Sequence, residues 1–492
     1  MEERNENGYN HILKYTSLFG GVQGLIILVG LVRNKSMAVF LGAAGVGLNS
    51  LLTSMQNFAS QCTNLGLSFG AVPRLSGDYE QQRASQLQHD IQVIRLWSFI
   101  AAALGLLFCV AVSPLINNLS FTWGNHTYHY AMLAVAVSMM AISGGEVAVL
   151  KATRRLGALA KVQIYSAVIS VLISIPLYKF FYHSGVVPAI VLTAAVSMVA
   201  TMVYSYRSYP LRLDFNRGML ADGADMIRLG LAYVLAAAIG SAAEMLIRSF
   251  LNVEGDLEAV GFYNVGYMIT IMYAGMVFSS MESDYFPRLS GVAHDINATN
   301  EAVNKQTEVS LLMLSPMLVA LLMMLPLLIP MLFSDEFLPV VQMAQVAILA
   351  MYFKVLSMPV AYITLARHRS LSFLFLESSY YVVLVLSIVV GFRYWGIFGT
   401  GVAIVVAHIV EYLLVMAYAY WRYSFRSSWT IGHYASVQMA IGGAAYLVSL
   451  LLEGWPYWII EAALTLVSTA YSVCELRQKT RLWNRLKQRI RI

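Results

Sequence analysis

Pro73-Arg74-Leu75-Ser76-Gly77 recurs unchanged as Pro287-Arg288-Leu289-Ser290-Gly291, 214 residues later. At the same offset, Val46-Gly47 matches Val260-Gly261. Both copies of the five-residue motif stand at the end of a long apolar segment that begins near the Val-Gly pair. The repeat predicts a duplicated membrane unit, and internal repeats in membrane proteins are typical of transporters.

The composition indicates that most of this chain lies within a membrane. Hydrophobic residues make up 59% and charged residues 12%, and the mean hydropathy is +0.66. Soluble domains carry about 25% charged residues, and an apolar stretch of about 20 residues crosses a bilayer. We therefore predict an all-α integral membrane protein of about 14 transmembrane helices. Their predicted centres lie near residues 23, 58, 103, 138, 170, 195, 240, 270, 320, 350, 381, 406, 442 and 465.

Each repeat holds six predicted spans, so both halves enter the membrane in the same direction. We expect two six-helix bundles in a pseudo-twofold arrangement, with a cavity between them. The predicted parts are an N-terminal bundle (1–206), a cytoplasmic linker (207–228), a C-terminal bundle (229–423), two further helices (424–474) and a basic amphipathic tail (475–492). We expect that tail to lie on anionic membrane lipids.

The distribution of basic residues predicts the orientation. If the N-terminus is cytoplasmic and the spans alternate, all but six of the 32 Lys and Arg residues fall on the cytoplasmic side. Both termini are therefore predicted to be cytoplasmic. The remaining six flank outer helix ends or lie within spans, where charge usually marks function: Arg33, Lys35, Lys179, Arg248, Lys354 and Arg393.

Each half places an arginine at the same end of its first helix, Arg33 in one and Arg248 in the other. With Lys35 they could bind an anionic headgroup, since a planar guanidinium suits phosphate oxygens. The alternative is snorkelling at a helix end. Glu244 stands four residues before Arg248, on the same helix face. It could neutralise Arg248 until an anion displaces it, carry a coupling proton, or form a structural ion pair.

Lys354 lies in the middle of a predicted span, so we expect it to face the bundle interior and a cavity. His408 and Glu411 are three residues apart in the twelfth span. They are candidates for proton or sodium coupling, or else structural polar residues. No metal site and no other cofactor is expected.

The second predicted span carries a broad polar stripe at helical spacing, which must face a cavity or other helices. Within it, Asn57 and Gln61 are candidate ligands for sugar hydroxyls, although such side chains also join helices together. Tyr267, in the corresponding span of the second half, could pack on a sugar ring or in the core. The stripe comprises Asn49, Ser50, Thr53, Gln56, Asn57, Ser60, Gln61, Asn64 and Ser68.

Catalysis and nucleic-acid binding are not expected. The predicted outer loops are short, about 15 residues at most, whereas membrane polymerases, ligases and glycosyltransferases usually carry large external domains. The sequence has no Walker motif, no Cys/His metal cluster and no GxSxG motif. An enzyme or an assembly partner is thereby disfavoured.

Arg33-Asn34-Lys35, Met37-Ala38-Val39-Phe40-Leu41-Gly42-Ala43 and Gly45-Val46-Gly47-Leu48 resemble the start of the Wzx-type O-antigen and polysaccharide flippases. Phe69-Gly70-Ala71-Val72-Pro73 resembles the lipid II flippases of the same superfamily, the multidrug/oligosaccharidyl-lipid/polysaccharide exporters. The resemblance implies alternating access between two bundles. Its implied substrate is undecaprenyl-pyrophosphate-linked oligosaccharide, an O-antigen or other surface polysaccharide unit moved to the outer leaflet of a bacterial inner membrane.

The resemblance also implies a cationic cavity, which falls on Arg33, and a monomer that delivers its product to polysaccharide polymerase machinery. Lipid II flippases carry further basic residues late in the second span, where this sequence has Ala59, Ser60 and Gln61. This difference disfavours lipid II as the substrate. The alternatives are a lipid II flippase and a cation-coupled multidrug exporter, but the latter usually relies on acidic cavity residues.

Overall fold

A computed structural model describes residues 2–121, 125–211, 217–367 and 369–479, and their regular structure is helical. The chain forms two compact units. The first comprises Met1–Gly261 with Leu332–Ser334, and the second comprises Phe262–Met331 with Asp335–Ile492.

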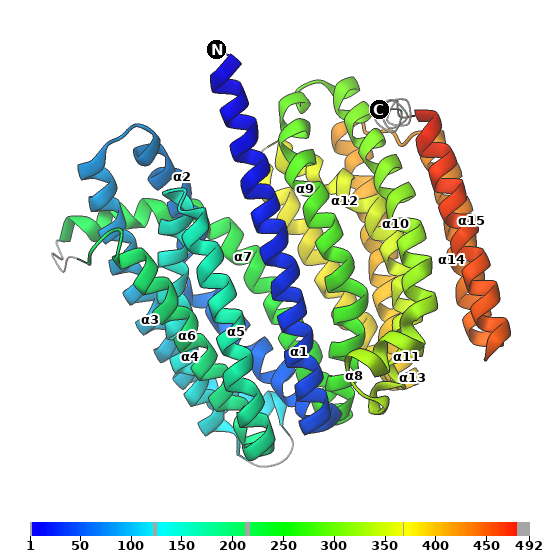
Figure 1. The fold of residues 1–492 in the computed structure, drawn as a ribbon, viewed down its shortest axis with the longest axis horizontal. Coiled ribbons are helices and arrows are strands. Elements are labelled where there is room, and N and C mark those ends of the chain that lie inside the picture. Colours follow the sequence, from blue (N-terminus) through cyan, green and yellow to red (C-terminus); the bar gives the residue numbers. More distant parts are fainter. Residues whose placement is uncertain (1, 122–124, 212–216, 368, 480–492) are drawn as a thin grey trace. The chain divides into compact units, whose positions relative to one another are not determined.

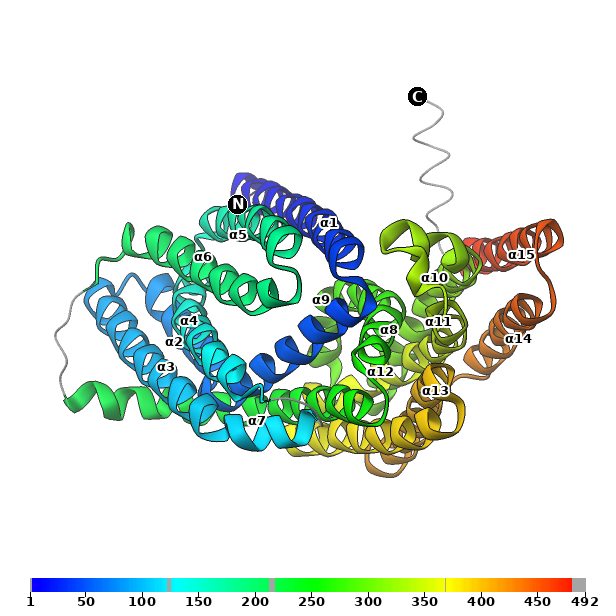
Figure 2. The ribbon, with the colours of Figure 1, turned by 90° about the horizontal axis from the view of Figure 1, so that it is seen from below.

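The first unit is a bundle in which α3 packs on α4, and α6 packs on both α4 and α5 (Figure 1). Its longest helix, α1, changes direction between its two halves (Figure 2) because Gly42 interrupts it with a φ of 67°. The helices are α1 (Glu2–Thr63), α2 (Leu67–Glu80), α3 (Ala84–Ser120), α4 (Thr127–Ala152), α5 (Leu156–Phe181), α6 (Val186–Tyr206), α7 (Arg217–Glu254) and the first part of α8 (Leu257–Tyr267).

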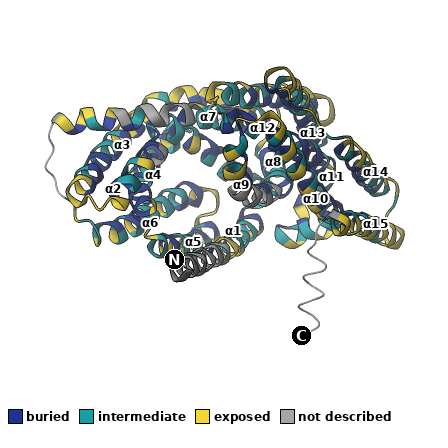
Figure 3. Ribbon diagram, turned by 90° about the horizontal axis from the view of Figure 1, so that it is seen from above, coloured by how far each residue is buried: buried dark blue, intermediate teal, exposed yellow. Residues whose placement is uncertain are grey.

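The second unit packs α12 and α11 on α13, while α14 and α15 pair with each other and carry many exposed apolar side chains (Figure 3). A π-helical turn, Met268–Met272, joins α8 to α9. The helices are α9 (Tyr273–Val292), α10 (Ile296–Leu332), α11 (Val340–Ile348), α12 (Ala350–Ala366), α13 (Ser370–Tyr423), α14 (Trp429–Leu451) and α15 (Trp455–Lys479).

Among the described residues, ten helical stretches are long and apolar enough to cross a bilayer. Three of them, with 42, 51 and 54 residues, are long enough for two crossings each, because one crossing takes about 20 residues. All fourteen predicted centres fall in helical segments. The predicted class, an all-α multi-pass membrane protein, is therefore confirmed.

The duplication is also visible in the helix ends. Helix α4 ends at Ala152 and α12 at Ala366, while α5 begins at Leu156 and α13 at Ser370, so both pairs keep the offset of the sequence repeat. The two units are thus built from the same helix plan at these positions.

One unusual backbone conformation repeats at the same offset. Tyr182, after α5, has φ 50° and ψ −133°, and Gly396, inside α13, has φ 57° and ψ −141°. Residues other than glycine rarely adopt a positive φ. Because Tyr182 has nearly the same backbone angles as Gly396, we infer that the fold requires the tight reversal at this position. In α13 it separates the eleventh and twelfth predicted spans.

The Val-Gly pair of the repeat marks a close approach of backbones. A Cβ atom on Gly47 of α1 would meet the carbonyl oxygen of Leu257 and the amide of Gly261, and one on Gly261 would meet the carbonyl oxygen of Ala43. Only glycine permits helices to touch at this separation. The pair therefore fixes the contact between α1 and α8 in the first unit.

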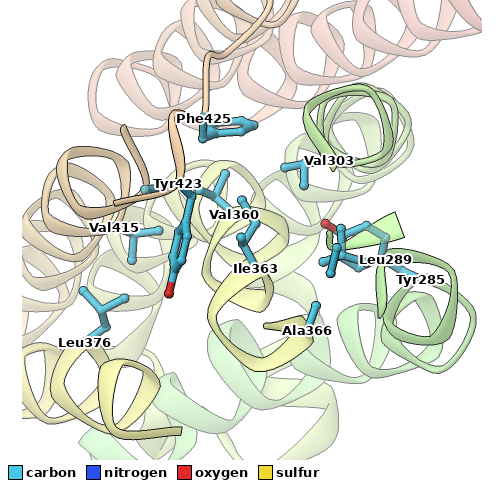
Figure 4. Close-up of a cluster of buried hydrophobic side chains, with 12 residues drawn as sticks. Tyr285, Leu289, Val303, Val360, Ile363, Ala366, Leu376, Val415, Tyr423 and Phe425 are labelled. Carbon is cyan, nitrogen blue, oxygen red and sulfur yellow. The ribbon is translucent and has the colours of Figure 1, made fainter. Parts of the chain in front are cut away.

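The five-residue motif anchors a core cluster in each unit. Leu75 packs in the first-unit cluster formed by α2, α3, α4 and α7, and Leu289 packs in the second-unit cluster with Val303 and Ile363 (Figure 4). Arg74 donates two hydrogen bonds, of 2.6 and 3.0 Å, to the carboxylate of the buried Asp90. Arg288 instead donates to Gln306 over 3.3 Å.

The predicted bounds of the linker and of the C-terminal tail can be compared with the structure only in part. Helix α7 begins at Arg217, inside the predicted linker 207–228, and residues 212–216 lie outside the described residues. Helix α15 continues to Lys479, and the remainder of the predicted tail, 480–492, also lies outside them. The division into two bundles, a linker and two further helices stays a prediction.

Candidate functional site

The candidate site of the first unit includes Arg248 on α7. This arginine is buried, and its Nε donates to Ser50 Oγ on α1 over 2.7 Å. One terminal nitrogen lies 3.3 Å from the carboxylate of Glu244, whose side chain is 38% exposed. The structure thus brings together the predicted Arg248, the predicted Glu244 and one residue of the polar stripe.

Arg33 lies on α1 and is half-buried. Its Nε is buried and has no hydrogen-bond partner, while the guanidinium lies within electrostatic range of Tyr178 on α5. A buried guanidinium nitrogen without an acceptor is unfavourable, so a ligand oxygen would stabilise it. Lys35, two residues further along α1, is also half-buried.

The polar stripe of α1 is divided between packing and exposure. Gln56 donates to the Met140 sulfur on α4 over 2.9 Å, and Asn64 donates to Gln61 Oε1 over 2.9 Å. Asn57 is exposed. The candidate Gln61 is therefore engaged in a local hydrogen bond, whereas Asn57 presents its amide outward from the first unit.

The candidate site of the second unit is built around Lys354 on α12. Its Nζ lies 2.9 Å from Glu411 Oε1 on α13, and the side chains are 26% and 7% exposed, respectively. His408, one turn earlier on α13, lies 4.0 Å from the other Glu411 oxygen and has its Nδ1 2.9 Å from the carbonyl oxygen of Ile404. Three of the predicted residues thus form one cluster.

Aromatic rings enclose this cluster. Lys354 lies 5.5 Å from the centroid of the Tyr380 ring, which also meets the His408 ring edge to face at 4.9 Å. Tyr267, the predicted aromatic ligand, stacks on Tyr263 with centroids 5.7 Å apart. It lies within electrostatic range of both Lys354 and Tyr380, so it belongs to the same cluster.

Sequence reasoning missed two members of this cluster, Glu377 and Tyr380, both on α13. Glu377 is half-buried and lies within electrostatic range of Lys354 and Glu411. A carboxylate in the apolar stretch 370–395 is the signal that could have revealed it, because intramembrane acids are as rare as intramembrane bases. With Glu377, the cluster holds two carboxyl groups for one lysine.

A further ion pair in the first unit serves packing. Arg95 on α3 and Glu146 on α4 are each 2% exposed and 2.8 Å apart. Arg95 also donates to the carbonyl oxygens of Tyr209 and Pro210, and Ser205 donates to Glu146. Four of the five guanidinium N–H groups of Arg95 have an acceptor within this cluster, so the pair joins α3, α4 and the chain after α6.

The two units therefore offer different chemistry. The first unit supplies guanidinium groups, one with an unsatisfied nitrogen, that can bind an anionic oxygen. The second unit supplies Lys354, which pairs with Glu411 and lies within electrostatic range of Glu377. Carboxyl groups in this arrangement can exchange a proton or a cation. Among the described residues, no group of three or more His, Cys, Asp or Glu side chains is arranged to hold a metal ion.

Comparison with solved structures shows which fold the chain has. An inward-facing multidrug resistance MATE family transporter of the MOP superfamily matches with a TM-score of 0.67 at 14% identity, covering 81% of this chain and 94% of that chain. The lipid II flippase MurJ, in an inward closed conformation, matches with a TM-score of 0.66 at 12% identity, covering 94% and 99%. A MOP superfamily transporter from Pyrococcus furiosus matches with a TM-score of 0.56 at 13% identity, covering 82% and 93%. The chain has the fold of these MOP superfamily proteins.

The family follows from the sequence. A family model described as polysaccharide biosynthesis protein matches residues 36–342, which is more than half of the chain. The chain therefore belongs to the polysaccharide biosynthesis protein family. No curated protein sequence matches it.

Proposed function

We propose that this protein is a flippase that moves undecaprenyl-pyrophosphate-linked oligosaccharide, an O-antigen or other surface polysaccharide unit, from the cytoplasmic to the outer leaflet. Membership of the polysaccharide biosynthesis protein family and a fold shared with a lipid II flippase support this proposal. The observation that carries it is Arg33, whose buried Nε has no hydrogen-bond partner and suits a phosphate oxygen.

The physical problem that such a protein solves is dehydration. Ionised pyrophosphate and sugar hydroxyls lose their hydration in the bilayer core, which is strongly unfavourable without replacement partners. Arg33, Lys35 and Arg248 would supply partners for the phosphates, and the exposed Asn57 would supply one for sugar hydroxyls. The polyprenyl chain can stay in lipid while the headgroup crosses.

Arg248 would act by exchange of partners. In the free protein Glu244 balances its charge over 3.3 Å, and Ser50 accepts from its Nε. An incoming phosphate can replace the partly exposed Glu244, because an oxyanion offers the same acceptor geometry with more charge. Binding of this kind is weak enough to permit release.

Coupling to an ion would reside in the second unit. Lys354, Glu411, Glu377 and His408 lie together, and a proton or sodium ion entering among the carboxyl groups weakens their hold on Lys354. The lysine would then be available to an anionic headgroup. No other cofactor is required by this scheme.

The proposal includes a location and partners. The protein would lie in a bacterial inner membrane as a monomer with both termini in the cytoplasm, its basic tail on anionic lipids, and polysaccharide polymerase machinery would receive its product. Lys and Arg placement supports this orientation.

One observation favours a second candidate, a cation-coupled multidrug exporter. Glu377 and Glu411 give the second-unit cluster two carboxyl groups for one lysine, which suits cationic substrates. The lipid II alternative is disfavoured because Ala59, Ser60 and Gln61 stand where lipid II flippases have basic residues.

Deletion of the gene, followed by analysis of lipid-linked oligosaccharides, tests the proposal. We expect a complete oligosaccharide unit to accumulate on the cytoplasmic leaflet. Complementation with Arg33→Ala should fail at normal protein level, while Lys179→Ala, which removes an exposed cation from α5, should restore surface polysaccharide. Normal polysaccharide in the deletion strain, together with new sensitivity to cationic drugs, would favour the exporter.

A further inference from the structure

A cavity of about 620 Å³ lies within the second unit, away from the Lys354 cluster. Its walls come from α10 near Pro326, the start of α11, α13 beside its bend at Gly396, and the connection from α14 to α15. Cavities of roughly 300–1,000 Å³ are the size that holds small ligands. In the predicted topology these connections follow odd-numbered spans, so the cavity would open on the outer side.

The cavity combines aromatic faces with a small number of polar groups. Trp395, Phe398, Tyr457 and Trp458 line it, together with Gln345 and Glu453. Gln345 is only 3% exposed, so an amide lies deep in the wall. Glu453 is the only charged lining residue, and no Lys or Arg is among the residues that the structure places there.

One aromatic wall is held in place by a proline position of α10. Pro326 has no amide hydrogen, so the carbonyl oxygen of Leu322, four residues earlier on α10, loses its usual helical partner. The Tyr457 hydroxyl approaches this oxygen at 3.4 Å and donates to the neighbouring Met323 oxygen over 2.9 Å. The α14–α15 connection is thereby fastened to α10, and the Tyr457 ring is fixed in position.

We propose that this cavity binds a neutral carbohydrate. The apolar C–H faces of a sugar ring pack on aromatic rings, and its hydroxyls can pair with the amide of Gln345 and the carboxylate of Glu453. A phosphate group is a poor occupant, because the lining offers it no cation and one repelling carboxylate. This site therefore recognises sugar, whereas the cations of the first unit suit the pyrophosphate.

Aromatic residues also gather at membrane surfaces without binding anything, and Trp455 illustrates this use. It lies three residues before Trp458, is 82% exposed and does not line the cavity. Trp458 is half-buried and lines the cavity. The two tryptophans thus provide a matched pair for experiment.

The source of the sugar rests on the proposed function. If the protein exports a lipid-linked oligosaccharide, the cavity on the predicted outer side would take a sugar of the exported glycan and hold it away from the transport path. Sugar binding itself can be measured without transport, so the two proposals can fail separately.

Saturation-transfer NMR on the full-length protein in nanodiscs of phosphatidylethanolamine and phosphatidylglycerol tests the site. The probes are the methyl glycosides of glucose, galactose, N-acetylglucosamine and rhamnose, with inorganic phosphate as competitor. We expect saturation of the C–H protons of at least one glycoside, no displacement by phosphate, and about tenfold weaker binding in Trp458→Ala. Trp455→Ala should bind as the wild type does, and Trp458→Phe should keep most of the affinity.

Three results would overturn the proposal. These are no saturation transfer to any of the four glycosides, equal losses in Trp458→Ala and Trp455→Ala, or displacement of the sugar by phosphate. Glu453→Gln provides a second test, because this variant keeps every aromatic ring. If the sugar affinity is unchanged in both Glu453→Gln and Trp458→Ala, the site is likewise refuted. Absence of the sugar site leaves the flippase proposal unaffected. A protein that binds the sugar but does not move the lipid-linked oligosaccharide between leaflets refutes only the flippase proposal.

Discussion

Replacing Lys354 with methionine should destabilise the second unit, because it leaves carboxyl groups without their cation. Lys354 Nζ lies 2.9 Å from Glu411, whose side chain is 7% exposed, and Glu377 lies within electrostatic range of both. Methionine keeps the length of the side chain and removes its charge. The substitution therefore tests the ion pair rather than the packing.

The expected size follows from burial. Removal of one partner from a buried pair typically costs about 3–5 kcal/mol, and the 26% exposure of Lys354 places this case at the lower end, at about 3 kcal/mol. Glu411→Gln should cost less, about 1–2 kcal/mol, because Glu377 remains near the lysine. The double variant should cost about 2 kcal/mol, which leaves a coupling of about 2–3 kcal/mol between the two positions.

Equilibrium unfolding of the purified full-length protein in mixed detergent and SDS micelles measures these free energies. The matched control is the exposed pair of Lys305 and Glu301 on α10, where Lys305→Met should have no measurable effect because solvent screens the charges. If the coupling between Lys354 and Glu411 is below about 0.5 kcal/mol, the pair is not the electrostatic unit described here.

Three other perturbations have clear expectations. Arg95→Met should lower the free energy of unfolding by about 3–5 kcal/mol in the same assay, because the buried Glu146 loses its charged partner. The double variant Arg95→Met with Glu146→Gln should recover part of this loss. Gly47→Val should abolish the yield of folded protein on size-exclusion chromatography, because its Cβ meets backbone atoms of α8, whereas Gly24→Ala, with open space at the Cβ, should not. An inside-negative membrane potential should speed outward movement of the anionic headgroup, by about 2.3 kcal/mol per charge per 100 mV. Flipping in vesicles that ignores an imposed potential would show that no net negative charge moves outward.

Much of the fold could be predicted because membrane helices are specified locally. Apolar runs of sufficient length placed all fourteen predicted centres on helices, and the repeated Pro-Arg-Leu-Ser-Gly identified equivalent positions in both halves. The structure adds the reason for the repeat, since Leu75 and Leu289 are core residues and the Val-Gly glycines touch another helix. Those roles depend on neighbours that no local pattern specifies.

The candidate site was less predictable because its members are distant in sequence. Glu244 and Arg248 could be paired from their spacing, and so could His408 and Glu411. The contacts of Ser50 with Arg248 and of Lys354 with Glu411 join different helices, so periodicity gave no indication of them. Glu377 has no charged residue of α13 at helical spacing to indicate a pair, although its own apolar surroundings marked it.

The most direct test of the central claim is reconstitution of the purified protein in liposomes that contain undecaprenyl-pyrophosphate-linked oligosaccharide, with a sugar-modifying enzyme outside the vesicles to report sidedness. We predict that the wild-type protein equilibrates the lipid between leaflets and that Arg33→Ala slows this by at least about tenfold, while Lys179→Ala matches the wild type. Equal rates for empty liposomes and for liposomes with the wild-type protein, or unimpaired flipping by Arg33→Ala, would contradict the account.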